Sequence, residues 1–204
     1  VKPTTFAQAA SIYHRFYNNL DHVEYDEFAI ASAAIFLASK VNEDPIRLKD
    51  LINVTQVTLD RDEWNNEVAN DGWLLRIRDT IIQCEMYIIR VLHFLPHTRL
   101  PHFYLLNYLS TLENCLPDEI KSQTPLAKCA MSLLQDFYFS PSIVLHKPEE
   151  AAIAILVLTT QIYGLQIPLT TDTDTWYRSF CPETRLDTIW EVIDDIMKIY
   201  EIKE

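Results

Sequence analysis

Apolar residues recur along this chain at the spacing of a helix rather than that of a strand. They return at positions i, i+3, i+4 and i+7, whereas a half-buried strand would alternate apolar and polar residues. Prolines and polar clusters interrupt the pattern and mark helix ends. The pattern predicts helices over residues 5–18, 27–41, 47–55, 73–94, 101–116, 125–139, 149–163, 174–180 and 185–202, with a polar loop over 60–72.

The same pattern occurs twice within the chain. An offset of 121 residues places segment 11–17 on segment 132–138 and also aligns the helices that follow them. The last helices match at an offset of 108, where Asp-Thr-Ile at 79–81 falls on Asp-Thr-Ile at 187–189. The offsets differ by 13 residues, roughly the length of the polar loop, which the second copy lacks. We therefore expect two copies of one helical fold.

The two copies differ in their number of helices. The second copy has five predicted helices and the first has four, so the helix that the first copy lacks would precede Val1 in the full protein. Each copy has a middle helix, 27–41 or 149–163, that is apolar nearly all round, which is typical of a helix surrounded by others. The predicted fold is all-α: one five-helix unit without its first helix over 1–97, and a second unit over 98–204.

The composition of the chain excludes several classes of function. The chain has only two glycines, which argues against Gly-rich phosphate loops and dinucleotide-binding motifs. The net charge is −12, and neither half shows the basic patch that a nucleic-acid-binding protein needs. No apolar run is long enough to span a membrane, so we expect no membrane partner. The four cysteines include no C-x-x-C pair, as expected for reduced thiols in an intracellular protein.

No group of residues indicates catalysis or metal binding. His93, His97 and His102 have a loosely metal-like spacing, but two prolines separate them and no Cys or carboxylate lies close in the sequence. Motifs such as H-E-x-x-H, G-x-S-x-G and the P-loop are missing. We therefore predict a protein that is not an enzyme and that uses neither a metal nor a cofactor.

Two charged residues break the repeat at positions that the pattern makes apolar or uncharged. Glu85 shares a helix face with several isoleucines, and its counterpart in the second copy is Ile193. Lys40 ends the first middle helix, and its counterpart is Gln161. A buried carboxylate without a partner is costly, so Glu85 needs a partner or an interface. A purely structural explanation is also open, because a cation is favoured at a helix C-terminus and Glu85 could lie at the edge of its apolar stripe.

Several segments resemble the cyclin family. Residues 33–43, Ala-Ala-Ile-Phe-Leu-Ala-Ser-Lys-Val-Asn-Glu, resemble the central helix of a cyclin box, and residues 84–94 resemble its last helix. The resemblance implies two tandem five-helix cyclin boxes, the first lacking its N-terminal helix. Within the family the chain resembles the transcription-type group, most closely cyclin Q (also called cyclin M), with cyclin L as the runner-up. The segments similar to cyclin Q are 12–16, 78–85, 101–106 and 152–168, and those similar to cyclin L are 50–54 and 165–168.

The resemblance implies a regulatory subunit that binds and activates a cyclin-dependent protein kinase as a heterodimer. The kinase would be cyclin-dependent kinase ten if the chain is cyclin Q-like, and the location would be the nucleus, with the cytoplasm second. The family's kinase-contacting Lys and Glu fall on Lys40 and Glu85. The remaining contacts fall on Leu37, Val41, Glu43, Ile89 and Phe94, and the family's usual acidic pair is reduced to Asn42-Glu43.

Two other functions fit the same pattern. A promoter-binding factor of the TFIIB type uses twin helical repeats on DNA, although the charge of −12 speaks against it. The other function is that of a helical scaffold with the cyclin fold that activates no kinase.

Overall fold

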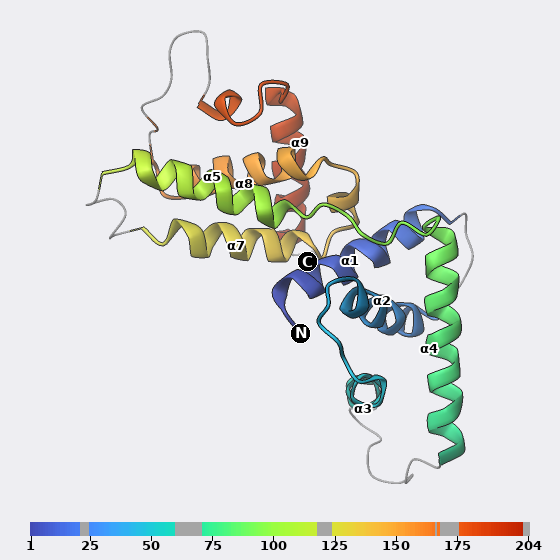
Figure 1. The fold of residues 1–204 in the computed structure, drawn as a ribbon. Helices are drawn as coiled ribbons and strands as arrows, with labels where there is room; N and C mark the ends of the chain where they lie inside the picture. Colours follow the sequence, from blue (N-terminus) through green and yellow to red (C-terminus); the bar gives the residue numbers. More distant parts are fainter. Residues whose placement is uncertain (21–24, 60–70, 118–123, 166, 168–175, 202–204) are drawn as a thin grey trace. The chain divides into compact units, whose positions relative to one another are not determined.

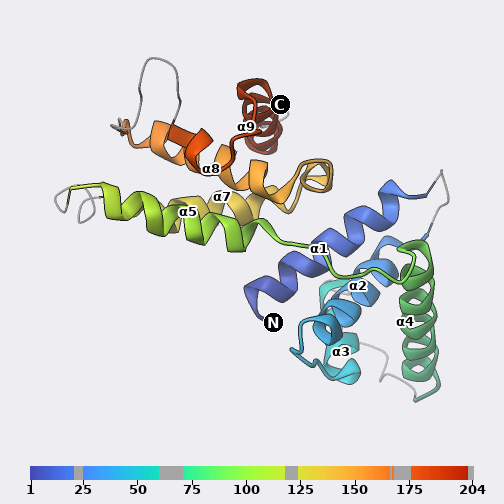
Figure 2. The same ribbon diagram turned by 45° about the horizontal axis from the view of Figure 1, so that its top comes forward.

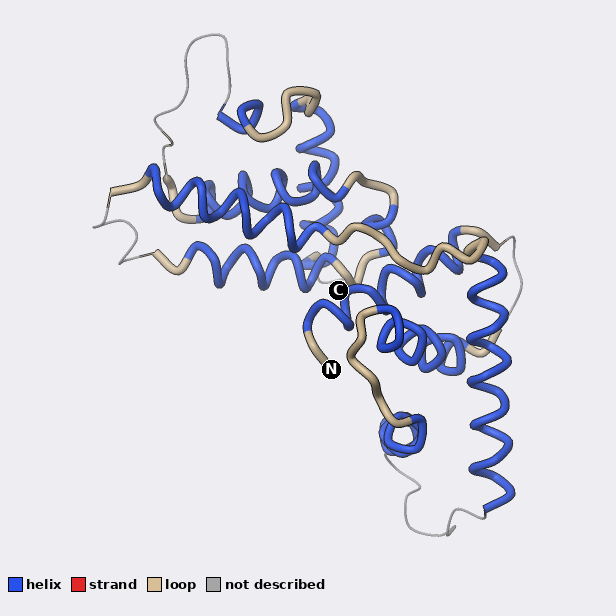
Figure 3. The backbone as a smooth tube through the Cα atoms, viewed as in Figure 1, coloured by secondary structure: helices blue, strands red, loops and turns tan. Residues whose placement is uncertain are grey.

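The structure is a computed structural model that describes residues 1–20, 25–59, 71–117, 124–165, 167 and 176–201 (Figure 1). Within these residues the regular structure is entirely helical and contains no strand (Figure 3). The all-α prediction is therefore confirmed. The polar loop predicted over 60–72 lies almost wholly outside the described residues. The chain divides into two compact units, Val1–Thr98 and Arg99–Glu204, and each is described by itself.

The first unit is built around helix α2. Its described helices are α1 (Pro3–Asn18), α2 (Glu27–Val41), α3 (Leu48–Leu59) and α4 (Asp71–Val91). α2 packs against all three others, which surround it in Figure 2. Asp26 caps the start of α2, because its carboxylate accepts a hydrogen bond from the Phe28 amide. The helix is apolar on nearly every side because it has a neighbour on nearly every side.

The second unit is built around helix α8 in the same way. It contains α5 (Pro101–Cys115), α7 (Leu126–Phe137), α8 (Pro148–Ile162) and α9 (Leu186–Tyr200). Two short 3₁₀ helices, η1 (Pro141–Val144) and η2 (Trp176–Ser179), lie between them in sequence. α8 packs against α5, α7 and α9, and six consecutive residues of it, 151–156, are fully buried. α5 and α7 run beside it in Figure 1.

The packing within the units is consistent with the sequence repeat. The offset of 121 carries the bounds of α2 onto those of α8, and the pairs α1–α2 and α2–α4 correspond to α7–α8 and α8–α9. In the second unit α5 packs on α7 and α8.

Several helix ends differ from the sequence prediction. α4 ends at Val91 rather than at residue 94, because His93 and Phe94 adopt left-handed backbone angles, φ 51° and φ 61°. α7 ends at Phe137 rather than at residue 139. In place of the helix predicted over 174–180, the described part of this segment forms only the four-residue η2. The sequence prediction missed η1, which starts where the Ser140 hydroxyl accepts a hydrogen bond from the Ser142 amide.

Candidate functional site

Lys40 and Glu85, the two residues that break the repeat, form an ion pair within the first unit. The Lys40 Nζ atom lies 2.6 Å from Glu85 Oε1 and 2.8 Å from Oε2, so the ammonium donates to both carboxylate oxygens. The Glu85 side chain is 7% exposed, whereas that of Lys40 is 50% exposed. The pair joins the last turn of α2 to the middle of α4. It therefore combines a buried acceptor with an ammonium that is half in solvent.

The helices explain why these side chains meet. Glu85 lies on the inward face of α4, between the buried residues Ile81 and Ile88. Lys40 lies in the last turn of α2, where the negative end of the helix dipole favours a cation. Its Nζ atom also sits 4.0 Å from the centre of the Phe36 ring, a cation–π distance. The partner that Glu85 needs is thus supplied by the chain itself.

The equivalent positions in the second unit show what the pair replaces. Gln161 is exposed at the end of α8, as Lys40 is at the end of α2. Ile193 is buried in α9, as Glu85 is in α4. The second unit therefore fills the inner position with an apolar side chain and needs no ion pair. Replacing a buried ion pair by apolar residues is often neutral or stabilising, so stability alone does not account for Lys40 and Glu85.

Glu43 has an unusual backbone conformation just after α2. Its φ is 51°, and the residue at the repeat-equivalent position, Gly164, has φ 64°. Both helices end in the same motif: the Glu43 amide donates to Lys40 O and the Asp44 amide to Ser39 O, as the Gly164 and Leu165 amides do after α8. Glycine adopts this conformation without strain and glutamate does not. An exposed glutamate held at a glycine position is a candidate functional residue.

Phe94 is exposed next to the end of α4. Its side chain is 70% exposed, and it follows His93, which is also left-handed. The conformation is fixed by hydrogen bonds from the Phe94 amide to Ile89 O and from the Arg15 guanidinium to Leu95 O, at 2.9 and 3.1 Å. A strained turn thus holds an aromatic ring in solvent, as at many sites that bind a partner.

The other predicted contact residues are less accessible. Leu37 is buried in the core of the first unit, and Val41 and Ile89 are partly buried against the same core. Leu37 is therefore placed to support the end of α2, and a contact role for it stays a prediction. Phe36 was not among the predicted contact residues, although its spacing of four residues from Lys40 places the two side chains side by side on a helix. Met86, which is exposed on α4 beside Glu85, was not among them either.

His93, His97 and His102, which the structure describes, differ in their surroundings. His102 is buried and stacked on Tyr138, and burial lowers the pKa of its imidazole. His93 and His97 are exposed. Among the residues that the structure describes, no group of three or more His, Cys, Asp or Glu side chains could hold a metal ion. Nor does the described part contain a helix that is both long and apolar enough to cross a membrane.

Comparison with known proteins finds a family that matches the first unit. Residues 1–95 match the family described as "Cyclin, N-terminal domain". The chain is 29% identical to cyclin-L1 of Danio rerio over 190 residues, covering 93% of this chain and 36% of that protein. It is 25% identical to cyclin-T1 of Mus musculus over 209 residues, covering 98% of this chain and 27% of that protein. The chain thus spans about a third of the length of these curated relatives.

A solved structure has the same fold. It is a chain of the yeast RNA polymerase II CTD kinase CTDK-1 complex, with a TM-score of 0.75 at 17% identity, and the match covers 98% of this chain and 59% of that one. Residues 1–95 thus match the cyclin N-terminal domain family, and the chain as a whole is similar to cyclins L1 and T1.

Proposed function

We propose that this chain binds and activates a cyclin-dependent protein kinase as the regulatory subunit of a heterodimer. The observation that carries the proposal is the Lys40–Glu85 pair. It occupies positions where the second unit has Gln161 and Ile193, and it lies in the segment that matches the cyclin N-terminal domain family. A similarly folded chain belongs to a CTD kinase complex, which adds support.

The docking face we propose combines charge with apolar surface. The half-exposed ammonium of Lys40 and the exposed carboxylate of Glu43 offer polar contacts near the end of α2. Phe94 offers an exposed apolar anchor after α4, and Val41 and Ile89 offer partly buried apolar surface. Aromatic anchors carry a large share of binding energy at protein interfaces. The carboxylate of Glu85 keeps the Lys40 ammonium in a fixed position before the partner arrives.

Activation would follow from preferential binding to one state of the kinase. A protein kinase is active when a helix glutamate pairs with the strand lysine that holds the ATP phosphates. A subunit that packs on that helix only in its inward position shifts the kinase toward the active state. A shift from 1:99 to 99:1 requires a preference of about 5.5 kcal/mol, which a few apolar anchors and one charged pair can supply.

Charge reversal tests the site. We expect Lys40→Glu or Glu85→Lys to abolish capture of the kinase while the far-UV circular dichroism stays helical. Removing the Lys40 charge costs about 1–2 kcal/mol, between the values for exposed and fully buried pairs, and leaves the protein folded. The matched control is Gln161→Glu, which places the same new charge at the equivalent exposed position of the second unit and should leave capture unchanged.

The double variant Lys40→Glu/Glu85→Lys separates a structural role from a contact role. It restores an ion pair between α2 and α4 with the charges exchanged. If the pair only stabilised the unit, the double variant would recover both stability and kinase capture. We expect stability to recover and capture to stay lost, because the surface that faces the kinase now has the wrong charge. Recovery of capture, or full capture by both single variants, would contradict the site.

The kinase and the cyclin subgroup are a finer part of the proposal. The chain shares similarity with cyclins L1 and T1, and its resemblance to cyclin Q stays a prediction. Affinity capture followed by identification of the bound kinase decides between them, since a cyclin Q-like chain would bring down cyclin-dependent kinase ten. A kinase assay with the purified pair excludes a scaffold role if the activity depends on this chain. We propose the nucleus as the site of action because the relatives are transcription-type cyclins.

A further inference from the structure

Helix α9 presents an unpartnered apolar stripe on the second unit. Leu186, Trp190 and Met197 are separated by four and seven residues, so they lie on one face of the helix. All three are about half exposed; Trp190 and Met197 are each 48% exposed. The stripe extends over roughly 16 Å, or three helical turns. Tryptophan is one of the side chains enriched among the residues that dominate binding energy at protein interfaces.

We propose that this α9 stripe binds a basic amphipathic segment of a partner protein. Acidic side chains adjoin the stripe: Asp187 and Asp194 lie three residues before and four residues after Trp190, and Glu191 follows it. A lysine or arginine that approaches here meets both the face of an indole ring and carboxylates. Apolar side chains of the same segment would cover Leu186 and Met197.

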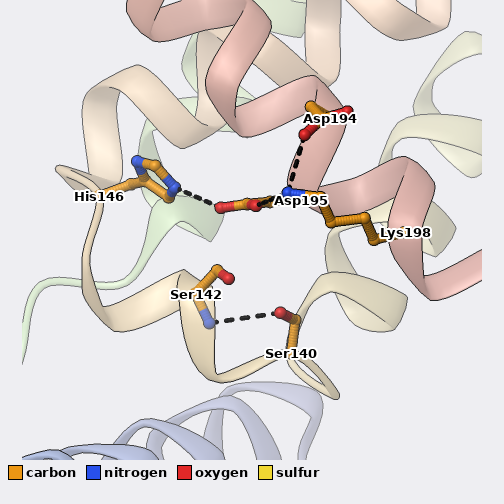
Figure 4. Close-up of polar contacts among 6 residues, drawn as sticks. All are labelled: Ser140, Ser142, His146, Asp194, Asp195 and Lys198. Atoms are coloured by element: carbon orange, nitrogen blue, oxygen red, sulfur yellow. Dashed lines mark hydrogen bonds and ion pairs between the residues drawn. The ribbon is translucent and has the colours of Figure 1, made fainter.

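The charges on α9 exclude other occupants. Lys198, the lysine of this helix, is bound by Asp194 at 2.8 Å and by Asp195 at 3.0 Å (Figure 4). Its charge is therefore already matched, whereas Asp187 and Glu191 have no ion-pair partner among the described residues. Residues 101–204 hold 7 basic and 15 acidic side chains, a net charge of −8. Such a surface repels nucleic acid, anionic lipid and a second copy of itself.

The repeat gives independent support. At an offset of 108, Met197 corresponds to Ile89, and at an offset of 121 the exposed Ile162 at the end of α8 corresponds to Val41. The face of the second unit that holds these residues is thus equivalent to the proposed kinase face of the first. This step rests on the proposed function. The second unit lacks the Lys–Glu pair and presents more apolar surface here, so it is suited to a different partner.

Fluorescence anisotropy with a designed peptide tests the proposal. The probe is a labelled amphipathic helix of roughly 18 residues, with leucines on one face and lysines and arginines on the other. A second peptide carries glutamate at every basic position. The protein is the full 204-residue chain. We expect Trp190→Ala/Met197→Ala to weaken binding of the basic peptide roughly tenfold or more. The matched control is Phe103→Ala/Leu106→Ala, which removes two exposed apolar residues of α5 in the same unit and leaves the net charge unchanged.

Several results of these binding measurements would contradict the proposed α9 site. Equal weakening by the α5 control, unchanged binding by the α9 variant, or equal affinity for the acidic peptide would overturn the proposal. So would a dimer in sedimentation that the α9 variant dissociates, because the occupant would then be a second copy. Asp187→Lys/Glu191→Lys changes exposed residues only and should weaken binding even if the apolar variant folds poorly. Lys40→Glu should leave peptide binding intact, so failure of the kinase proposal would be seen separately.

Discussion

At the scale of single residues, the repeat supplies an internal control for Lys40, Glu85 and Glu43. Glu43 and Gly164 have nearly the same backbone angle and the same pair of capping hydrogen bonds. A β-carbon added at Gly164 would meet no atom within 4 Å, so glutamate there would suffer only the conformational cost of the left-handed region. Comparing Glu43 with Gly164 therefore separates the cost of the left-handed backbone from the cost of side-chain packing.

Exchanging the two residues tests whether Glu43 is kept for binding. We expect Glu43→Gly to raise the free energy of unfolding by about 1 kcal/mol and Gly164→Glu to lower it by a similar amount, because only glycine adopts positive φ without strain. Glu43→Gly should also weaken kinase capture although the protein is more stable. Thermal melts and kinase capture measure the two effects. A variant that is more stable and still captures the kinase fully would leave Glu43 without a contact role.

The residues of the candidate site could be predicted only in part. The repeat comparison selected Lys40 and Glu85 because a charge stood where the other copy had none. It did not show that they bind each other, since 45 residues separate them and the contact depends on how α4 packs on α2. The Phe94 conformation was equally hidden, because two consecutive left-handed residues that are not glycine have no sequence signal.

At the scale of elements, the sequence predicted the long helices, whose positions follow from the spacing of apolar residues. The bounds of α2 agree with the prediction because an acidic cap, an apolar stretch and a polar stop mark them. The short elements were missed or overextended: η1 and η2 have four residues each, too few for a period to show. Their existence depends on Ser140, on local turns and on the helices nearby, which a pattern of apolar residues does not encode.

A polar cluster joins α9 to the segment after η1. His146 Nε2 lies 3.0 Å from Asp195 Oδ2, and Lys198 donates to the other oxygen of the same carboxylate. Burial raises the pKa of Asp195, but hydrogen bonds from His146, Lys198 and Ser142 outweigh it, so the pKa lies below its ordinary value. A carboxyl with a lowered pKa stabilises the fold above its unfolded pKa of about 3.9 and loses this effect as the pH falls through the folded value.

Asp195→Asn should therefore destabilise the protein by about 1–2 kcal/mol at pH 7, because it removes the carboxylate charge that Lys198 and His146 contact. The difference from the unchanged chain should shrink as the pH falls below the unfolded pKa of about 3.9 and through the lower pKa of Asp195 in the folded protein. Thermal melts across pH 3–7 measure it. The control is Asp194→Asn, which contacts the same lysine but has a 68% exposed side chain and should change stability little. A pH-independent difference for Asp195→Asn would show that the network does not act through its charge.

At the scale of the whole molecule, the two units share a packing scheme but differ in charge and surface. Residues 1–100 carry a net charge of −4 and residues 101–204 one of −8, and the exposed charged features that we assign to binding differ between them. Because the two units share a helix packing but differ in their exposed side chains, each unit can bind a different partner. The repeated helix packing also raises DNA as an alternative partner to the kinase, because twin helical repeats of the TFIIB type bind duplex DNA.

We expect no DNA binding by the whole chain. Affinity for duplex DNA comes largely from lysines and arginines that displace counterions, and it falls steeply as salt rises. This chain has 17 basic and 29 acidic residues. Its net negative charge therefore repels the phosphates of DNA. A mobility-shift assay with a random duplex at low salt should show no complex. The informative comparison is Lys40→Glu: if a complex did form, weakened with salt and was lost in this variant, the end of α2 would be a DNA contact, and the kinase-binding interpretation of Lys40 would give way to it.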